Sequence, residues 1–319
     1  MIRFVHPLTK EPLAADGHGH LCSSDGSGRV LFRLVAGCYD FAQLQDKAGD
    51  RVYYDAHYHE KLGPPHFPLP TESFARLWGQ NSAYETLRGA VGDVKDKAVL
   101  LLGNGLSLKE LTLAAEGAEL VFTDLSASAV RAARSAWLGL APAETGGRVH
   151  FHAVDALYLP YEDQAFDLIY GCAFAHHVED LRALLAEVHR CLKPGGRCVF
   201  LDDAHSPWWQ AAKRTVLRPL QALSHWKNGI SPEDLRATRK GGYTQTELEG
   251  LQREIGFRHL VFRRTAFLEH LVRRGLNKLG GKLLARGMVP LARWVDGRLL
   301  GPLGVIEKHG LLLVWGYTK

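Results

Sequence analysis

The chain has 319 residues, 46% of them hydrophobic, and its 39 Lys and Arg side chains slightly outnumber its 34 Asp and Glu. This composition excludes a disordered chain, a collagen-like repeat and a disulfide-rich scaffold. The net charge of +5 conceals an asymmetry, because residues 1–204 carry 19 basic and 26 acidic side chains whereas residues 205–319 carry 20 basic and 8 acidic ones. The five cysteines form no CxxC pair and the first residues hold no long apolar run, so we expect a cytoplasmic protein without a signal peptide.

Residues 1–60 alternate short hydrophobic patches with turn-forming segments such as DGHGH and SSDGSG, which predicts a small β-rich element of hairpins. The four prolines of KLGPPHFPLP disfavour a helix, so residues 61–70 are interpreted as a linker. The segment TESFARLWGQNSAYETLRGAV then predicts a helix capped by Thr71, which begins the main domain at 71–319.

From residue 98 onward, strand-like and helix-like segments alternate, which predicts a parallel sheet with helices on both faces. The expected strands are 98–102, 119–123, 149–154, 166–170, 197–201, 258–264 and 310–317. The expected helices include SLKELTLAAEGA, SASAVRAARSAWLGL, DLRALLAEVHRCL closed by a KPGG turn, and TQTELEGLQREIGF. Helical insertions are expected at about 205–250 and 265–308. Ligands of such sheets bind at the carboxyl ends of the strands.

The first strand–helix turn, VLLLGNGLSLKEL, contains Gly103 and Gly105, which let backbone approach a ligand closely. Asp124 follows about twenty residues later at a strand end, where a carboxylate can accept hydrogen bonds from two ribose hydroxyls. A dinucleotide-binding GxGxxG would need glycine at position 108, which is Leu108 here, so the pattern disfavours NAD and FAD.

GNG, TDLS, VDALYLP, FDLIYG and LKPGG occur in this order, and together they resemble class I S-adenosylmethionine-dependent methyltransferases of the type 11, ubiquinone–menaquinone-like group. The resemblance implies a Rossmann-like, seven-stranded, mostly parallel sheet and S-adenosyl-L-methionine as cofactor. It assigns the following cofactor contacts: Gly103, Asn104 and Gly105 to methionine and ribose, Asp124 to the ribose hydroxyls, Leu125 to the adenine face, Asp155 and Ala156 to the adenine edge, and Gly171 and Cys172 to the floor beneath the sulfonium. Two departures from the family pattern are Leu101, where an acidic residue is usual, and Ser107, where a third glycine is usual.

Candidate proton acceptors lie after the fourth and fifth of these strands, and they are His176, His177, Asp203 and His205, with Asp202 beside them. The alternative is that the histidines pack on the sheet or orient the next helix. Candidate substrate contacts are Trp78, Asn81, Tyr84 and Trp208, for which ordinary packing is the alternative.

The amino-terminal segment also resembles the zinc-ribbon-like unit that precedes some methyltransferases of this group. Its knuckles read His6-Pro-Leu-Thr9 and Cys22-Ser-Ser-Asp25, so only one of four thiolates remains. His18 and His20 could add nitrogen ligands, but we expect a metal-free remnant.

The basic last third has several interpretations: a solvated helical surface, a surface for an anionic membrane, or a site for an anionic small substrate. No RNA-binding module is apparent, so no nucleic acid partner is expected. The predicted function is methyl transfer to O, N or C of a small or lipophilic molecule. The alternatives are a membrane-surface methyltransferase of an isoprenoid, quinone-like or lipid substrate, and a catalytically silent binding protein with the same fold.

Overall fold

A computed structural model describes residues 2–25, 27–44, 51–56, 58, 76–140, 148–207, 242–278 and 282–319. The expected linker at 61–70, the expected cap Thr71 and most of the first helical insertion, including Trp208, lie outside these residues. Among the described residues, no helix is both long and apolar enough to cross a bilayer.

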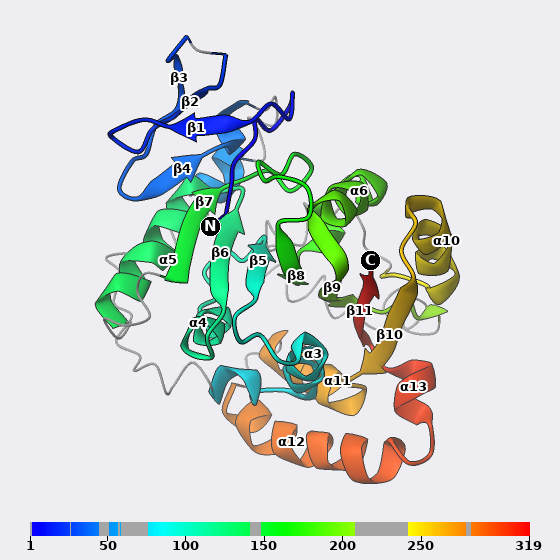
Figure 1. Cartoon of the computed structure of the whole chain (residues 1–319). Helices are drawn as coiled ribbons and strands as arrows, with labels where there is room; N and C mark the ends of the chain where they lie inside the picture. The colour runs from blue at the N-terminus through cyan, green and yellow to red at the C-terminus, as the bar shows by residue number, and fades with distance from the viewer. Residues whose placement is uncertain are drawn as a thin grey trace.

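The core is an eight-stranded sheet with the order β10-β11-β9-β8-β5-β6-β7-β4 (Figure 1). The pairs from β4 to β9 are parallel, and β10 and β11 join antiparallel at one edge. The chain leaves β5 towards β6 and β7 and then returns to β8 on its other side, so the strand order reverses at β5. A crevice for a ligand is expected at the carboxyl ends of β5 and its neighbours.

Seven of the eight strands of this sheet correspond to those expected, and β4 was not expected. They are β4 Cys38–Asp40, β5 Ala98–Leu102, β6 Glu119–Asp124, β7 Val149–Ala153, β8 Phe166–Cys172, β9 Leu192–Asp203, β10 His259–Thr265 and β11 Leu312–Thr318. The helices are α3 Ser82–Val91, α4 Thr112–Ala115, α5 Ala127–Leu140, α6 Leu181–Cys191, α10 Gln245–Ile255, α11 Leu268–Lys278, α12 Lys282–Val295 and α13 Val305–His309. Shorter turns of helix are η1 Ala42–Leu44, η2 Lys109–Leu111, η4 Ala175–His177 and η6 Asp296–Leu300.

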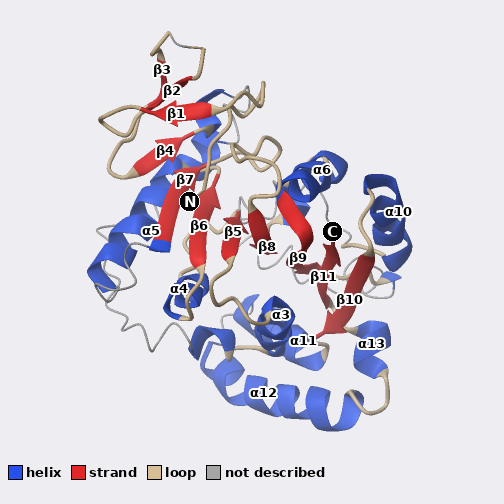
Figure 2. Ribbon diagram, in the orientation of Figure 1, coloured by secondary structure: helices blue, strands red, loops and turns tan. Residues whose placement is uncertain are grey.

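Helices flank the sheet (Figure 2), and two clusters of buried hydrophobic residues lie on its two faces. On one face, α3, α4 and α5 pack against outward residues such as Leu101 and Phe122. On the other face, α6, α10 and the amino-terminal element pack against Leu100, Leu102 and Phe200. Because successive strand residues point to opposite faces, a buried parallel strand is apolar throughout, which explains why these segments were recognisable as unbroken apolar runs.

The expected count of seven strands is corrected to eight by β4. This strand comes from the amino-terminal element and pairs in parallel with β7, where Phe41 N donates to Ala153 O at 2.8 Å. The strands β1 Leu13–Ala15, β2 Leu21–Ser23 and β3 Val30–Phe32 form a separate antiparallel sheet beside it. A three-residue strand carries too little pattern to be recognised, yet it satisfies the open edge of β7.

Three local expectations were wrong in detail. The helix expected through residues 71–91 is interrupted, since α3 begins at Ser82 with Asn81 as its N-cap, whose side chain accepts from Tyr84 N at 2.7 Å. SLKELTLAAEGA forms η2 followed by the four-residue α4 rather than one helix. The KPGG segment lies within the long strand β9 instead of forming a separate turn.

Candidate functional site

The turn after β5 presents bare backbone at the edge of the sheet. Gly103 and Gly105 both have positive φ, of 57° and 53°, a conformation that favours glycine. A Cβ at Gly103 would collide with the ring of Phe174, and a Cβ at Gly105 would lie 2.6 Å from the hydroxyl of Tyr58. A ligand resting on this turn therefore packs beside these two rings or displaces them.

Asp124 ends β6 and is only 7% exposed. Its Oδ2 accepts from Gly105 N at 2.8 Å and its Oδ1 accepts from Ser126 N at 2.9 Å, which connects the strand end to the glycine turn. Burial raises the pKa of Asp124 to about 6 against these hydrogen bonds, and the charge of Asp55 adds to the rise. The group therefore titrates near neutral pH, and it keeps lone pairs for further donors.

Asp55 comes from the helical residues 51–56, which the amino-terminal element brings to the start of α5. Its Oδ1 accepts from Ser126 Oγ at 2.6 Å and from Ser128 N at 3.0 Å. Tyr58, from the same segment, reaches Gly105. Residues 51–58 therefore lie over the carboxyl end of β6. The sequence analysis did not predict this covering segment, because no motif in residues 51–58 indicates it.

The end of β7 supplies Asp155 and Ala156, both buried, beside the half-buried Leu125 that follows β6. Asp155 Oδ1 accepts from Leu157 N at 3.0 Å, whereas its Oδ2 is buried without a hydrogen-bond partner. Asn104 Oδ1, in the glycine turn after β5, is another buried acceptor without a hydrogen-bond partner.

These two unsatisfied acceptors test whether the residues fit an adenosine-containing cofactor. A buried acceptor without a donor costs about 1–3 kcal/mol, so such atoms in a native site call for a ligand or water. The donor groups of S-adenosylmethionine, namely its adenine amino group, ribose hydroxyls and α-ammonium, match the acceptors Asp155, Asp124 and Asn104. The donor set therefore fits the cofactor that the motifs imply.

Gly171 and Cys172 end β8. A Cβ at Gly171 would lie 2.8 Å from the ring of Phe200 and 3.1 Å from that of Phe174, so only glycine fits. Burial raises the pKa of the Cys172 thiol to about 11, which keeps it neutral.

A half-buried imidazole and a buried carboxylate form a pair where the chain leaves β8 and β9. His176 Nδ1 lies 2.9 Å from Asp202 Oδ1, and Asp202 Oδ2 accepts from Trp315 Nε1 at 3.2 Å. Burial raises the pKa of Asp202, against the hydrogen bond and charge of His176. The ring centroids of His177 and His176 lie 4.1 Å apart with the rings tilted by 42°, and His177 Nδ1 lies 3.3 Å from the Tyr54 hydroxyl. His176 is thus held by the Asp202 carboxylate, and His177 by Tyr54 of the covering segment.

The other two candidate acceptors lie at the end of β9 and just after it. Asp203 ends β9, and its carbonyl accepts from Tyr243 N at 3.2 Å. His205 donates its N–H to Tyr243 O at 3.0 Å, and its carbonyl accepts from Arg264 at 2.8 Å. Both backbones are fixed by Tyr243, near the end of the first expected insertion, and that of His205 also by Arg264.

The candidate substrate residues near α3 have structural partners. Trp78 is 6% exposed and donates from Nε1 to Thr112 Oγ1 at 3.1 Å, Asn81 caps α3, and Tyr84 lies over the Lys109 ammonium at 4.5 Å. Because α3 begins after Asn81, the three do not share one helix face as expected.

Lys109 and Glu110 are functional candidates that sequence reasoning missed. Both are buried, at 4% and 0% exposure, and their ion pair of 2.5 Å lies against Ser107 and Asn104 of the glycine turn. The only sequence signal was a charged pair directly after an otherwise apolar strand and turn.

Two histidines of the amino-terminal element accept hydrogen bonds from backbone N–H groups of its loops. His6 Nδ1 accepts from Thr9 N at 3.2 Å and His20 Nδ1 accepts from Leu34 N at 3.0 Å, while Cys22 is buried in the hairpin. Within the described residues, no group of three His, Cys, Asp or Glu side chains is arranged to hold a metal ion.

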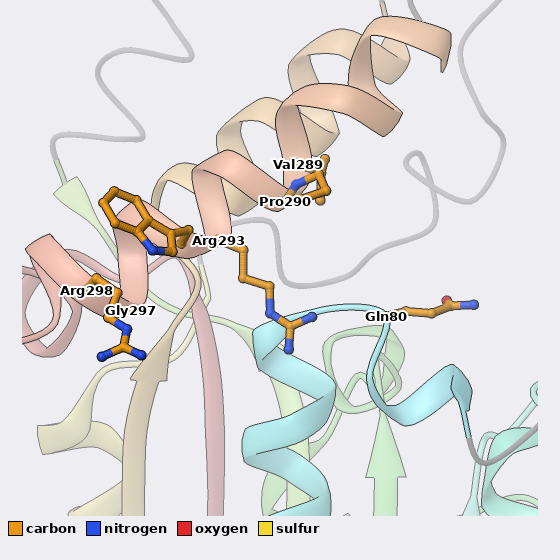
Figure 3. Close-up of a pocket in the computed structure, with 7 residues that line it drawn as sticks. Gln80, Val289, Pro290, Arg293, Gly297 and Arg298 are labelled. Carbon is orange, nitrogen blue, oxygen red and sulfur yellow. The ribbon is translucent and has the colours of Figure 1, made fainter.

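A surface cavity of about 470 Å³ lies against α12 and the turn that contains Gln80. Figure 3 shows Arg293 reaching from α12 towards the turn at Gln80, and Arg298 of η6 lines the same cavity. Arg293 donates to Gly79 O at 2.7 Å and pairs with Glu85, so it fastens α12 to the start of α3.

Comparison with known proteins identifies the domain type. Residues 100–200 match the family model described as a methyltransferase domain. The demethylmenaquinone methyltransferase of Clavibacter sepedonicus is 33% identical over 118 residues, which are 37% of this chain and 46% of that protein. The enzyme of the same name from Streptomyces avermitilis is 29% identical over 174 residues, or 52% of this chain and 70% of that protein. The chain thus matches less than half of the length of the first of these relatives.

Solved structures agree on the fold. Phosphoethanolamine N-methyltransferase 2 of Haemonchus contortus, in complex with S-adenosyl-L-methionine, superposes with a TM-score of 0.50 at 15% identity, covering 82% of this chain and 60% of that one.

Proposed function

Because this chain carries a class I S-adenosylmethionine-dependent methyltransferase domain, we propose that it transfers a methyl group to a small or lipophilic acceptor bound beside His176. The single observation behind the placement is the His176–Asp202 pair, 2.9 Å apart at the strand ends. The bound cofactor supplies an electrophilic methyl group on its sulfonium.

The residues of this chain have separable tasks. Asp124 accepts from the ribose hydroxyls and Asp155 Oδ2 from the adenine amino group, which fixes the nucleoside end. Asp202 accepts a hydrogen bond from the Nδ1–H of His176 in the tautomer that carries its proton on Nδ1, so Nε2 is the ring nitrogen that can take up a proton. His176 then takes a proton from an acceptor O–H or N–H, and the imidazolium that forms is stabilised by Asp202.

Calorimetry with S-adenosylhomocysteine, followed by a transfer assay over phenols, hydroquinones and amines, tests the proposal. We expect binding by the wild-type protein and turnover with one acceptor class. Absence of binding would refute the proposal. Binding without turnover of any acceptor would favour the catalytically silent alternative.

A second candidate function, methylation of a quinone-like or lipid substrate at a membrane surface, is favoured by the outer face of α12 to α13. Exposed apolar side chains gather there, with Trp294 at 55% and Leu303 at 75% exposure; the others are Met288, Leu291 and Leu299. Residues 268–309 carry eight Lys and Arg against three Asp and Glu. Apolar side chains flanked by positive charge are typical of surfaces that bind anionic bilayers.

Vesicle flotation at low salt distinguishes this membrane-surface function from methylation of a water-soluble substrate. We expect flotation with vesicles containing phosphatidylglycerol, little with phosphatidylcholine alone, and loss of binding in Trp294→Glu. Leu138→Glu is the matched control, since Leu138 is 56% exposed on α5 and should have no effect. Equal flotation of Trp294→Glu and the wild type would refute this surface.

A further inference from the structure

A cavity of about 390 Å³ lies between the amino-terminal element and the start of α5. Figure 1 shows this element at the β4 edge of the large sheet, beside α5. The walls of the cavity come from β3 and the turn after it, from β4 and η1, and from α5. None of the residues assigned to the cofactor lines it. Cavities of roughly 300–1,000 Å³ commonly hold small molecules, so this one has room for a ligand of its own.

The walls of this cavity carry positive charge without a counter-ion. Residues 27–37 and α5 together hold four arginines and no Asp or Glu, although residues 1–204 as a whole are acidic. Arg33 and Arg131 line the cavity, and among the described residues neither guanidinium has an ion pair or a hydrogen bond. Asp40 is the only carboxylate among the described residues that line the cavity, and it already pairs with Arg51. Two guanidinium groups therefore remain for an anion.

A third arginine lies against the same wall. The guanidinium of Arg134 occupies the position that a Cβ at Gly37 would take. Burial raises the pKa of the Cys38 thiol in this wall, and the charges of Arg134 and Arg131 oppose the rise, so both guanidinium groups lie near Cys38. Positive charges that gather in this way repel one another, and an anion bound among them would be stabilised.

The remaining lining is apolar. Val30 and Val35 stand at the surface with 39% and 59% of their area exposed, whereas Val130 is fully buried. Ala127 and Ala153 line the cavity with small side chains that leave it open. Covering the two exposed valines would remove apolar surface from water, which favours a ligand with an apolar body.

We propose that this cavity is a second ligand site, which binds an organic carboxylate with an apolar body. Arg33 and Arg131 hold the carboxylate, because the planar guanidinium fork matches its two oxygens. The apolar body lies against Val30, Val35 and Val130. The inference is independent of methyl transfer, since the site shares no residue with the cofactor site.

A ligand series measured by calorimetry tests both halves of the site. Octanoate carries the charge and the apolar chain, 1-octanol keeps the chain without the charge, and acetate keeps the charge without the chain. We expect octanoate to bind at least about tenfold more tightly than either of the others, because only octanoate uses both contacts. Equal binding of octanol or of acetate, or no binding of octanoate, would overturn the inference.

Variants assign the binding to the cavity. Arg131→Met should weaken octanoate about tenfold, because hydrogen bonds to the ligand charge are lost. Arg131→Lys, which keeps the charge without the fork, should lie between this variant and the wild type. Arg253→Met is the matched control, since Arg253 is exposed on α10, which contacts β10 at the opposite edge of the sheet.

The Arg131 side chain is exposed, so its variants should keep the urea midpoint of the wild type. We expect Arg253→Met to bind octanoate as the wild type does. An unchanged octanoate affinity in Arg131→Met, or an equal loss in Arg253→Met, would overturn the site.

A titration of octanoate into protein saturated with S-adenosylhomocysteine separates this site from the cofactor site. We expect the octanoate affinity to be unchanged, whereas mutual exclusion of the two ligands would place octanoate in the cofactor site and overturn the inference. If the protein binds no S-adenosylhomocysteine, the proposed function fails, and the octanoate series still decides this inference by itself.

Discussion

Cofactor affinity should depend on pH through Asp124. Burial raises the pKa of this carboxyl to about 6, and its ionised form is the better acceptor for ribose hydroxyls. Affinity should therefore be full above pH 7 and should fall as the pH drops below 6. The cofactor's own α-amino and α-carboxyl groups titrate outside the interval from pH 5 to 7.

The size of the effect follows from the fraction of Asp124 that is ionised. With a pKa of about 6, roughly one tenth of the carboxyl is ionised at pH 5 and about nine tenths at pH 7, so affinity should drop about tenfold between them. The same raised pKa means that the unliganded native state binds a proton more tightly than the unfolded chain. Its stability should consequently decline as the pH rises from about 4 to 6.

Calorimetric titration with S-adenosylhomocysteine at pH 5, 6, 7 and 8 measures this dependence. Asp124→Asn, which cannot ionise, should bind more weakly by about 1–3 kcal/mol and without the tenfold change. Asp55→Asn should move the midpoint to lower pH, because the charge of Asp55 raises the pKa of Asp124. Constant wild-type affinity from pH 5 to 8, or an unchanged slope in Asp124→Asn, would refute the reasoning.

Three further changes have defined outcomes. His176→Ala should lower kcat about 100- to 10,000-fold for an O–H or N–H acceptor, whereas the affinity for S-adenosylhomocysteine measured by calorimetry should stay unchanged. An unchanged kcat would exclude His176 as the proton acceptor. Gly316→Ala places a Cβ against the backbone carbonyl of Cys198, so urea unfolding should show a loss of about 3 kcal/mol or more, whereas Gly250→Ala, with open space in α10, should be neutral or slightly stabilising. Asn81→Ala removes the N-cap of α3 and should lower the free energy of unfolding by about 1 kcal/mol; no change in the urea midpoint would contradict the cap.

Much of the fold follows from local pattern. The strand at 98–102 was predicted to the residue because a parallel strand covered on both faces is apolar at every position and ends at a glycine turn. Asp124 and Asp155 were placed at strand ends for the same reason, since a polar side chain that directly follows a buried strand must lie at the edge of the sheet.

Tertiary structure alone decided contacts between distant or unpatterned residues. His176 meets Asp202, 26 positions later in the chain, because η4 follows β8 and Asp202 lies near the end of β9, the strand next to β8. The cover at 51–58 and the pairing of β4 with β7 depend on how the amino-terminal element packs, which no short motif encodes. Lys109 and Glu110 carry charges that a sequence reading places in solvent. In the folded protein, Tyr170, Ser107 and Asn104 donate hydrogen bonds to Glu110, which allows the pair to be buried. The free energy of a buried charge is set by the partners that the fold brings to it.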